Sequence, residues 1–332
     1  MSTCPRLAIL LLLVAILSTI PTLNAQDGAK IYASGMKSTV MVINPDRQST
    51  GSGSLINLKD GYILTNWHVA RNATEVVVIF PLWQNGKPVK ELESYMKQAA
   101  KVGALGKVVA QDEKVDLAVI KLTELVKIPQ GSLAVKFAAD SPATGSKIAS
   151  IGNPAASEAM WAYTPGEIRN VYKKKWVSGS RGMKIGDHEA TIIEATSPTS
   201  PGDSGGPCFN EKGEQVGVTQ GGLDARIAQG YSYFIDVTEV QGFLKKNKIP
   251  FNQSNEIARL PDPAEPKVKL DPSAEELARQ ERTASSMMTL IRPLANDPGR
   301  QSSAVDKLRQ IINLYPKTEA AKEARELLKK IQ

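Results

Sequence analysis

Cysteine and histidine are both scarce in this chain of 332 residues, which holds two of each. Cys4 lies before the apolar run in an N-terminal segment that export would remove, so the remaining chain would keep one thiol, Cys208. A single thiol excludes an internal disulfide, and the fold must therefore rest on its apolar core. Cys208 itself is expected to serve as a small buried residue in a strand rather than as a reactive group.

Aromatic side chains and charge clusters are also sparse. Aromatic residues make up 5% and hydrophobic residues 42% of the chain, which is typical of a soluble globular protein. The 41 basic residues outnumber the 34 acidic ones by seven, a balance that favours acidic substrates or anionic surfaces. The charges are scattered, and the one basic cluster, residues 172–176, is expected on a solvated loop or strand edge. No nucleic-acid motif occurs, so no nucleic-acid partner is expected.

The longest apolar run lies at the N-terminus. Arg6 precedes an apolar run from Leu7 to Ile20, which is followed by small residues up to Ala25. This order predicts a secretory signal peptide at residues 1–25, and the run is short for a membrane span. We therefore expect an exported protein, periplasmic or extracellular, that meets a membrane only transiently. An uncleaved N-terminal anchor is the alternative.

Glycines surround a serine in the hexapeptide Gly202-Asp203-Ser204-Gly205-Gly206-Pro207. A serine hydroxyl is a weak nucleophile unless a base removes its proton and N–H donors receive the oxyanion. Glycines allow the sharp turn that brings the N–H groups of Gly202 and Ser204 toward one point. The alternative is a Gly-rich turn with no catalytic role. A base and an acid elsewhere in the chain would favour the catalytic interpretation over it.

The scarcity of histidine leaves two candidates for that base. His68 follows an apolar, β-branched run after the Asp60-Gly61 turn, which predicts a strand that ends at the imidazole. His188 stands between two acidic residues and is expected on a solvated loop, without a role. Asp116, just before the apolar run 117–122, suits the acid that orients the imidazole, because such an acid must be shielded from water. The alternative is a strand-edge aspartate that faces water.

Together these segments resemble the trypsin-like serine proteases, and in particular their bacterial Deg/HtrA-like branch. The resemblance covers roughly residues 30 to 245 and includes the order His, Asp, Ser. The motifs that carry it are Gly51-Ser52-Gly53-Ser54-Leu55-Ile56, Asp60-Gly61-Tyr62-Ile63-Leu64-Thr65-Asn66, Val115-Asp116-Leu117-Ala118-Val119, Ile151-Gly152-Asn153-Pro154 and Gly213-Glu214-Gln215-Val216-Gly217-Val218. It implies a mainly β fold, a double antiparallel β-barrel with the active site in the crevice between the halves.

The resemblance implies a role for each site residue. His68 would act as general base and then as general acid, Asp116 would orient it, and Ser204 would attack the carbonyl carbon. The N–H groups of Gly202 and Ser204 would form the oxyanion hole. This chemistry needs no cofactor and no metal.

The substrate-binding positions follow from the same resemblance. Pro198 would stand at the base of the pocket for the side chain before the scissile bond, with Thr199 beside it. Since neither is acidic, small or medium apolar side chains should be preferred over Lys or Arg. The segment Gln220-Gly221-Gly222 would pair with the substrate backbone. No Arg-Ile-Val-Gly-Gly segment precedes the first strand, so activity is expected without zymogen cleavage.

The composition of the sequence changes after Pro250. Residues 251–271 hold several prolines among charged residues, which predicts a semi-stiff linker between a protease domain at 26–250 and a helical module at 272–332. Three helices are expected, at 272–292, 302–315 and 318–331. The last two resemble one tetratricopeptide-like hairpin, which cannot bury its apolar face alone. The module should therefore dock on the protease, on a second copy or on a partner; a tail that only completes the protease surface is the alternative.

One departure from the Deg/HtrA-like pattern stands out. Nothing here resembles the PDZ domain that usually follows the protease in that branch. Residues 91–101, inserted between barrel strands, have helical character and are expected to decorate the surface near the cleft; a role in shaping access to the cleft is the alternative.

Two classes of function remain. The first is an exported serine endopeptidase that hydrolyses envelope or extracellular proteins through an acyl-enzyme intermediate. The second is a protease-fold scaffold or binding protein that recruits partners, or a second copy, through residues 272–332. The joint presence of base, acid, nucleophile and glycines favours the peptidase, because degenerate members of such families usually lose a triad residue.

Overall fold

The computed structural model describes residues 25–98, 102–155, 157, 160–180, 183–222, 230–251 and 272–331. The expected signal peptide lies outside the described residues apart from Ala25, and the expected linker lies outside them apart from Phe251. Within the described ranges, no helix combines the length and the apolar character that a bilayer crossing requires.

The first half of the chain forms a closed antiparallel barrel with the strand order β1-β2-β3-β8-β7-β4. Its strands are β1 (Thr39–Asn44), β2 (Ser49–Asn57), β3 (Tyr62–Thr65), β4 (Glu75–Ile79), β7 (Gly103–Asp112) and β8 (Leu117–Leu122). Val40 and Val42 of β1 belong to the core inside this barrel, whereas Met41 and Ile43 belong to the larger cluster outside it. Since side chains alternate along a strand, β1 is buried on both faces.

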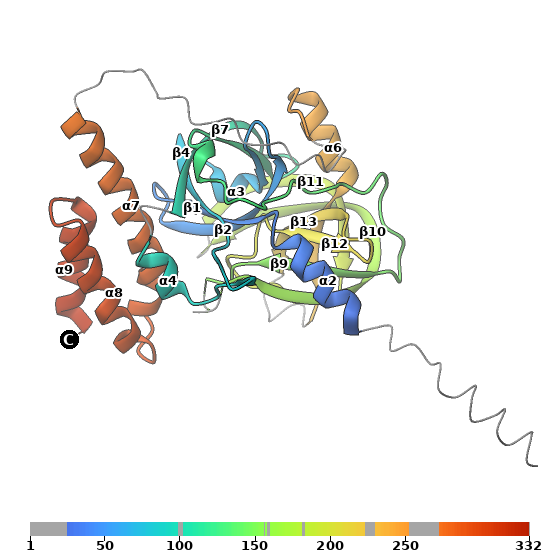
Figure 1. Cartoon of the computed structure of the whole chain (residues 1–332). Coiled ribbons are helices and arrows are strands. Elements are labelled where there is room, and N and C mark those ends of the chain that lie inside the picture. The colour runs from blue at the N-terminus through green and yellow to red at the C-terminus, as the bar shows by residue number, and fades with distance from the viewer. Residues whose placement is uncertain are drawn as a thin grey trace, which may run out of the picture.

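A second closed barrel follows, in the order β10-β11-β14-β13-β12-β9. Its strands are β9 (Lys147–Gly152), β10 (Ala162–Ser180), β11 (Met183–Ala195), β12 (Pro207–Asn210), β13 (Gln215–Gly222) and β14 (Ser232–Asp236). Cys208 is fully buried in its core beside Ile193 and Phe234, and burial raises the pKa of the thiol. This confirms the expected role of Cys208 as a small apolar residue. The mainly β, double-barrel fold is as predicted (Figure 1).

Short elements connect and flank the barrels. They are α2 (Ala25–Gly35), α3 (Trp67–Ala70), β5 (Trp83–Gln84), β6 (Lys87–Pro88), α4 (Leu92–Met96), η1 (Leu125–Lys127) and α6 (Val237–Lys246). The Asp236 side chain accepts a hydrogen bond from the N–H of Thr238 and so caps α6.

The insertion that contains α4 is more than surface decoration. Leu92, Tyr95 and Met96 are buried in the same apolar cluster as residues of both barrels. The Tyr95 hydroxyl accepts hydrogen bonds from Leu82 N–H at 2.9 Å and from Trp161 Nε1–H at 2.7 Å. It also donates to the carbonyl of Val89 at 2.7 Å. The insertion therefore ties the first barrel to the segment before β10.

The C-terminal helices are α7 (Pro272–Ala295), α8 (Gln301–Leu314) and α9 (Glu319–Ile331), close to the predicted bounds. Helix α7 contacts β1, β2 and β4, and α8 and α9 pack against α7 on its outer side (Figure 1). Met287, Met288 and Ile291 of α7 are buried and belong to the same apolar cluster as Met41 and Ile43 of β1. Arg282 of α7 forms an ion pair with Glu75 of β4. Of the surfaces considered for docking, the module therefore occupies the surface of the first barrel.

Candidate active site

The His68 imidazole is held by a buried carboxylate. Its Nδ1 lies 2.8 Å from Asp116 Oδ2 and 3.0 Å from Oδ1, and the backbone N–H of His68 donates to Oδ1 at 3.0 Å. Asp116 is fully buried, whereas 23% of the His68 side chain is exposed. Because a carboxylate can only accept, the proton sits on Nδ1, and the neutral ring keeps a lone pair on Nε2.

Local structure differs from the sequence expectation at His68. Strand β3 ends at Thr65, and His68 lies on the one-turn helix α3 rather than at the strand end. Asp116 immediately precedes β8, as predicted, and adopts a positive φ of 55°. Its carbonyl accepts a hydrogen bond from Asn66 Nδ2 at 3.0 Å, and its N–H donates to the Glu113 carbonyl at 3.1 Å. These bonds hold the acid in a backbone conformation that non-glycine residues seldom adopt.

Strand β2 anchors the serine loop to the first barrel. The Ser52 N–H donates to the Ser204 carbonyl at 2.7 Å, and the Ser52 hydroxyl donates to the Gly202 carbonyl at 2.9 Å. A Cβ atom on Gly51 would lie 2.7 Å from the Val69 side chain and 3.0 Å from the Ser204 carbonyl oxygen. The absence of a side chain at Gly51 therefore allows the helix that carries His68 to lie close to Ser204.

The Ser204 hydroxyl donates a 3.3 Å hydrogen bond to the Gln220 carbonyl, and not to His68. Among the residues that the structure describes, none accepts a hydrogen bond from the N–H of Gly202 or of Ser204. Gly202 has φ +103°, a conformation that side chains disfavour, and its Cα faces Asn153 and Ala155 so closely that a Cβ atom would overlap them. Two backbone donors are therefore left open beside the serine.

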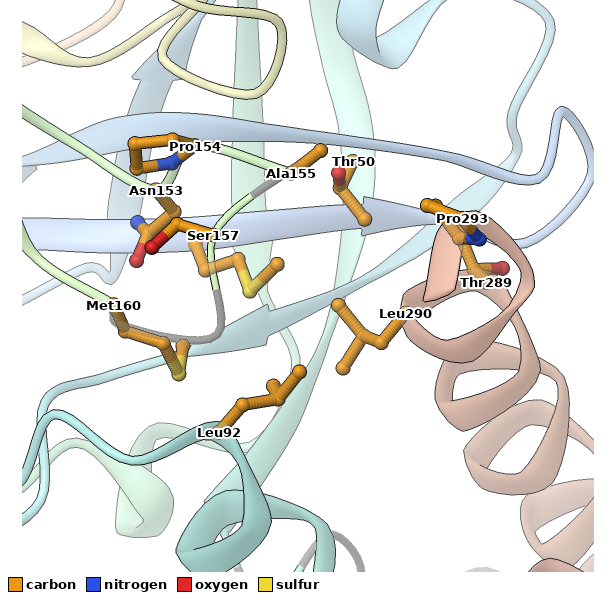
Figure 2. A pocket seen from close by; sticks show the side chains of 11 residues that line it. Thr50, Leu92, Asn153, Pro154, Ala155, Ser157, Met160, Thr289, Leu290 and Pro293 are labelled. Atoms are coloured by element: carbon orange, nitrogen blue, oxygen red, sulfur yellow. The ribbon is translucent and has the colours of Figure 1, made fainter. Parts of the chain in front are cut away.

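The loop behind Gly202 faces the helical module. Thr289, Leu290 and Pro293 of α7 line a small cavity whose opposite wall includes Asn153 and Ala155 (Figure 2). The cavity measures about 20 Å³, enough for a water molecule and too little for a ligand.

Of the expected substrate-binding residues, Gln220 and Gly221 lie next to Ser204. Gln220, Gly221 and Gly222 form the end of β13, where Gly221 pairs with Tyr233 and Gly222 with Ser232. A Cβ atom on Gly221 would lie 3.7 Å from Ser204 Oγ.

The two residues expected at the pocket base differ in burial. The Pro198 side chain is exposed, whereas Thr199 is half-buried. Thr199 directs its N–H and its hydroxyl to the Ser232 hydroxyl, at 3.0 and 2.9 Å. Ser232, which sequence reasoning missed, is buried and adds a hydroxyl to this region.

Asp203 is buried beside Ser204. Its Oδ2 accepts the N–H of Ser200 at 2.8 Å, while Oδ1 has no hydrogen-bond partner among the described residues. Burial raises the pKa of this carboxyl to about 6, although the Ser200 hydrogen bond opposes the shift. Asp203, in the serine loop, therefore changes its charge within the mildly acidic pH range.

His188 was expected on a solvated loop, and this is wrong. It lies in β11, is 3% exposed, and pairs across the hairpin with Trp176. The flanking acidic residues suggested solvent, but they point the other way because strand side chains alternate. The buried positions Gly186, His188, Ala190 and Ile192 follow that period of two, which is the signal that could have found it.

The comparisons with known proteins agree with this fold. Residues 51–218 match the trypsin-like peptidase domain family, just over half of the chain. The chain is 31% identical over 174 residues to a probable periplasmic serine endoprotease DegP-like of Hahella chejuensis, covering 52% of this chain and 30% of that one. It is 30% identical over 203 residues to the serine endoprotease DegS of Haemophilus influenzae, covering 59% of this chain and 49% of that one.

Among solved structures, the active form of the Rv3671c protease from M. tuberculosis is similar with a TM-score of 0.50 and 23% identity, covering 67% of this chain and 85% of that one. The chain therefore belongs to the trypsin-like peptidase family. Its curated relatives are of the Deg/HtrA kind, as the motifs predicted. The chain spans about half or less of the length of these relatives.

Proposed function

We propose that this protein is an exported serine endopeptidase with the triad Ser204, His68 and Asp116. The observation that carries the proposal is the buried Asp116 carboxylate, whose two oxygens lie within 3.0 Å of His68 Nδ1. This contact favours the tautomer with a lone pair on Nε2, the form that can accept a proton from serine. Family membership supports the same chemistry.

In the proposed reaction, Ser204 Oγ attacks the carbonyl carbon of the scissile peptide bond while its proton passes to His68 Nε2. The hydroxyl must first leave the Gln220 carbonyl, its partner in the resting structure. The imidazolium then protonates the leaving amine, which yields an acyl-enzyme and a free amino terminus. Water, activated by the same imidazole, hydrolyses the ester and regenerates Ser204.

The N–H groups of Gly202 and Ser204 would stabilise the oxyanion. Their support is that neither has a hydrogen-bond acceptor among the described residues, so both can donate to the substrate without breaking a bond. One such donor typically contributes about 3–4 kcal/mol to transition-state stabilisation.

We infer a preference for small or medium apolar side chains before the scissile bond. Pro198 and Thr199 carry no charge, and the hydroxyls of Thr199 and Ser232 satisfy each other rather than facing the substrate. Residues Gln220 to Gly222 would pair with the substrate backbone from the end of β13. Profiling on a peptide library checks this, and a clear preference for Lys or Arg would contradict it.

Export and domain boundaries complete the proposal. We propose a signal peptide at 1–25, a protease domain at 26–250, a linker at 251–271 and a helical module at 272–332. The relatives described as periplasmic support an exported location. We therefore expect its substrates to be proteins or peptides in the periplasm or outside the cell. Sequencing the N-terminus of the exported protein should find a start after Ala25; an intact first segment would favour the anchor.

Labelling with a fluorophosphonate tests the enzyme directly. Wild-type protein should be labelled at Ser204 and should cleave an unfolded protein. Ser204→Ala and His68→Ala should lose nearly all hydrolysis, roughly 10⁴-fold or more, while the melting temperature stays within a few degrees. A folded wild type that neither labels nor cleaves would instead support a protease-fold scaffold that recruits partners through the helical module.

A further inference from the structure

His188 bridges the two barrels at the site of the triad acid. Its Nδ1 lies 2.5 Å from the carbonyl oxygen of Glu113, and its Nε2 lies 2.7 Å from Ser178 Oγ. A carbonyl only accepts, so Nδ1 donates to Glu113 and the neutral ring accepts from the Ser178 hydroxyl. Both ring nitrogens of this 3% exposed side chain are thus satisfied.

The Glu113 carbonyl connects His188 to the triad. The same oxygen accepts the N–H of Asp116 at 3.1 Å, so one carbonyl joins the backbone of the triad acid to the His188 ring. The neighbouring residue of β11 adds a second bond, from Glu189 N–H to the Lys114 carbonyl at 2.7 Å. The loop that leads to Asp116 is therefore pinned by the second barrel.

His188 also packs beneath the residue that precedes the base. Its ring lies 5.8 Å from the ring of Trp67 at 63° and 5.1 Å from that of Trp176 at 31°. Trp67 begins the one-turn helix α3, whose second residue is His68. One side chain from the second barrel therefore contacts both segments that position the His68–Asp116 pair.

We propose that His188 is a positioning residue for the His68–Asp116 pair, acting through the Glu113 carbonyl and the Trp67 ring. The proposal rests on the proposed peptidase function. Asp116 keeps a positive φ of 55°, a conformation that a short loop holds only when neighbours constrain it. Loss of the His188 hydrogen bond would let the loop relax and would misplace the carboxylate relative to His68, and displacements of about 1 Å at such groups can cost about 100-fold in rate.

Two substitutions separate this role from simple packing. In His188→Asn the amide nitrogen can take the place of Nδ1 and donate to Glu113, whereas in His188→Gln the longer amide reaches the place of Nε2, toward Ser178. We expect kcat to fall about 10- to 100-fold in His188→Gln, with KM within about twofold. His188→Asn should recover most of this loss.

Two further variants serve as a control and as a second test of the proposal. Ser178→Ala removes the other ring partner and should leave kcat within about twofold, because it leaves the bond to Glu113 intact. Gly186→Ala retains His188 in the chain but adds a Cβ atom 2.9 Å from Trp67 and 3.0 Å from both His188 Cε1 and a Glu113 carboxylate oxygen, so the ring must shift. It should lower kcat as His188→Gln does, and it keeps the proposal testable if His188→Gln fails to fold.

A proton NMR measurement makes the test independent of turnover. In a Ser204→Ala background, the His188 variants hold one histidine, so the low-field Nδ1 proton signal reports on His68 bound to Asp116. The signal should stay sharp in His188→Asn and should broaden or shift in His188→Gln. Equal behaviour of the two variants, in rate and in signal, would overturn the proposal. A wild type that fails to react with fluorophosphonate would overturn the peptidase function, while the signal still decides the role of His188.

Discussion

The backbone N–H of Ala155 donates a 2.8 Å hydrogen bond to the carbonyl oxygen of Pro201, one residue before Gly202. The turn that presents the two open N–H donors is therefore built on the loop after β9 as well as on β2. On its other side this loop meets α7 across the small cavity of Figure 2. The consequence is that small changes around Gly202 should affect catalysis more than folding.

Gly202→Ala is expected to lower kcat by about 100-fold or more, with a small effect on KM. The added Cβ atom would overlap Asn153 and lie 2.6 Å from the Ala155 nitrogen, so the turn must shift and its donors with it. Gly131→Ala is the matched control, because Gly131 also has a positive φ, +88°, but has nothing within 4 Å of such an atom. Steady-state kinetics on both variants checks this, and equal activities would show that the turn tolerates the shift.

Asp203→Asn should change the pH dependence of stability. The carboxyl has a pKa raised to about 6 by burial, so ionising it costs more in the folded than in the unfolded chain. The wild type should therefore lose stability relative to Asp203→Asn as pH rises from about 4 to about 7, by an amount on the order of 2–3 kcal/mol. Urea unfolding of both proteins at several pH values measures this difference. A difference that does not change with pH would mean that the carboxyl finds a partner.

Tyr95→Phe should destabilise the fold while leaving the triad intact. The hydroxyl makes three hydrogen bonds, and burial raises its pKa to about 12. Its loss would leave the buried Trp161 Nε1 without an acceptor, at a cost of about 1–3 kcal/mol. Tyr62→Phe is the control, because the Tyr62 hydroxyl bonds to none of the described residues. Thermal unfolding should separate the two variants, and a loss of fluorophosphonate labelling in Tyr95→Phe would contradict the expected separation.

A chain that ends near Asn252 should still hydrolyse small peptides, because the residues proposed for the triad and for the oxyanion hole lie before that point. It should melt at a lower temperature and self-associate more, since removal of α7 uncovers the apolar face of β1, which belongs to the same buried cluster as Met287 and Met288. Peptide hydrolysis and light scattering on both lengths check this. Loss of peptide hydrolysis through unfolding would make the helices part of the protease fold.

Point substitutions in α7 test how much the packing of this helix stabilises the full-length chain. Met288→Ala, at a fully buried position, should cost about 2–5 kcal/mol, whereas Leu277→Ala, at a position 44% exposed, should cost less than about 1 kcal/mol.

Short patterns in the sequence predicted the chemistry that we propose for this protein. The glycines around Ser204, the turn and apolar run before His68 and the apolar run after Asp116 are local features, which a sequence displays directly. The three C-terminal helices were also predictable, because their apolar residues recur with the helical period and Thr318 accepts the N–H of Ala321 as an N-cap. The double barrel was predicted from the family resemblance that these motifs carry.

Only the tertiary structure decided which distant surfaces meet. His188 has polar neighbours and looked solvated, but β11 turns its ring inward against Trp67, a residue of the other barrel. Helix α7 could have covered a partner, and it covers β1 instead. The physical reason is the same in both cases: hydrogen-bond partners and apolar contacts between segments far apart in sequence arise only once the barrels have closed, and no local pattern encodes them.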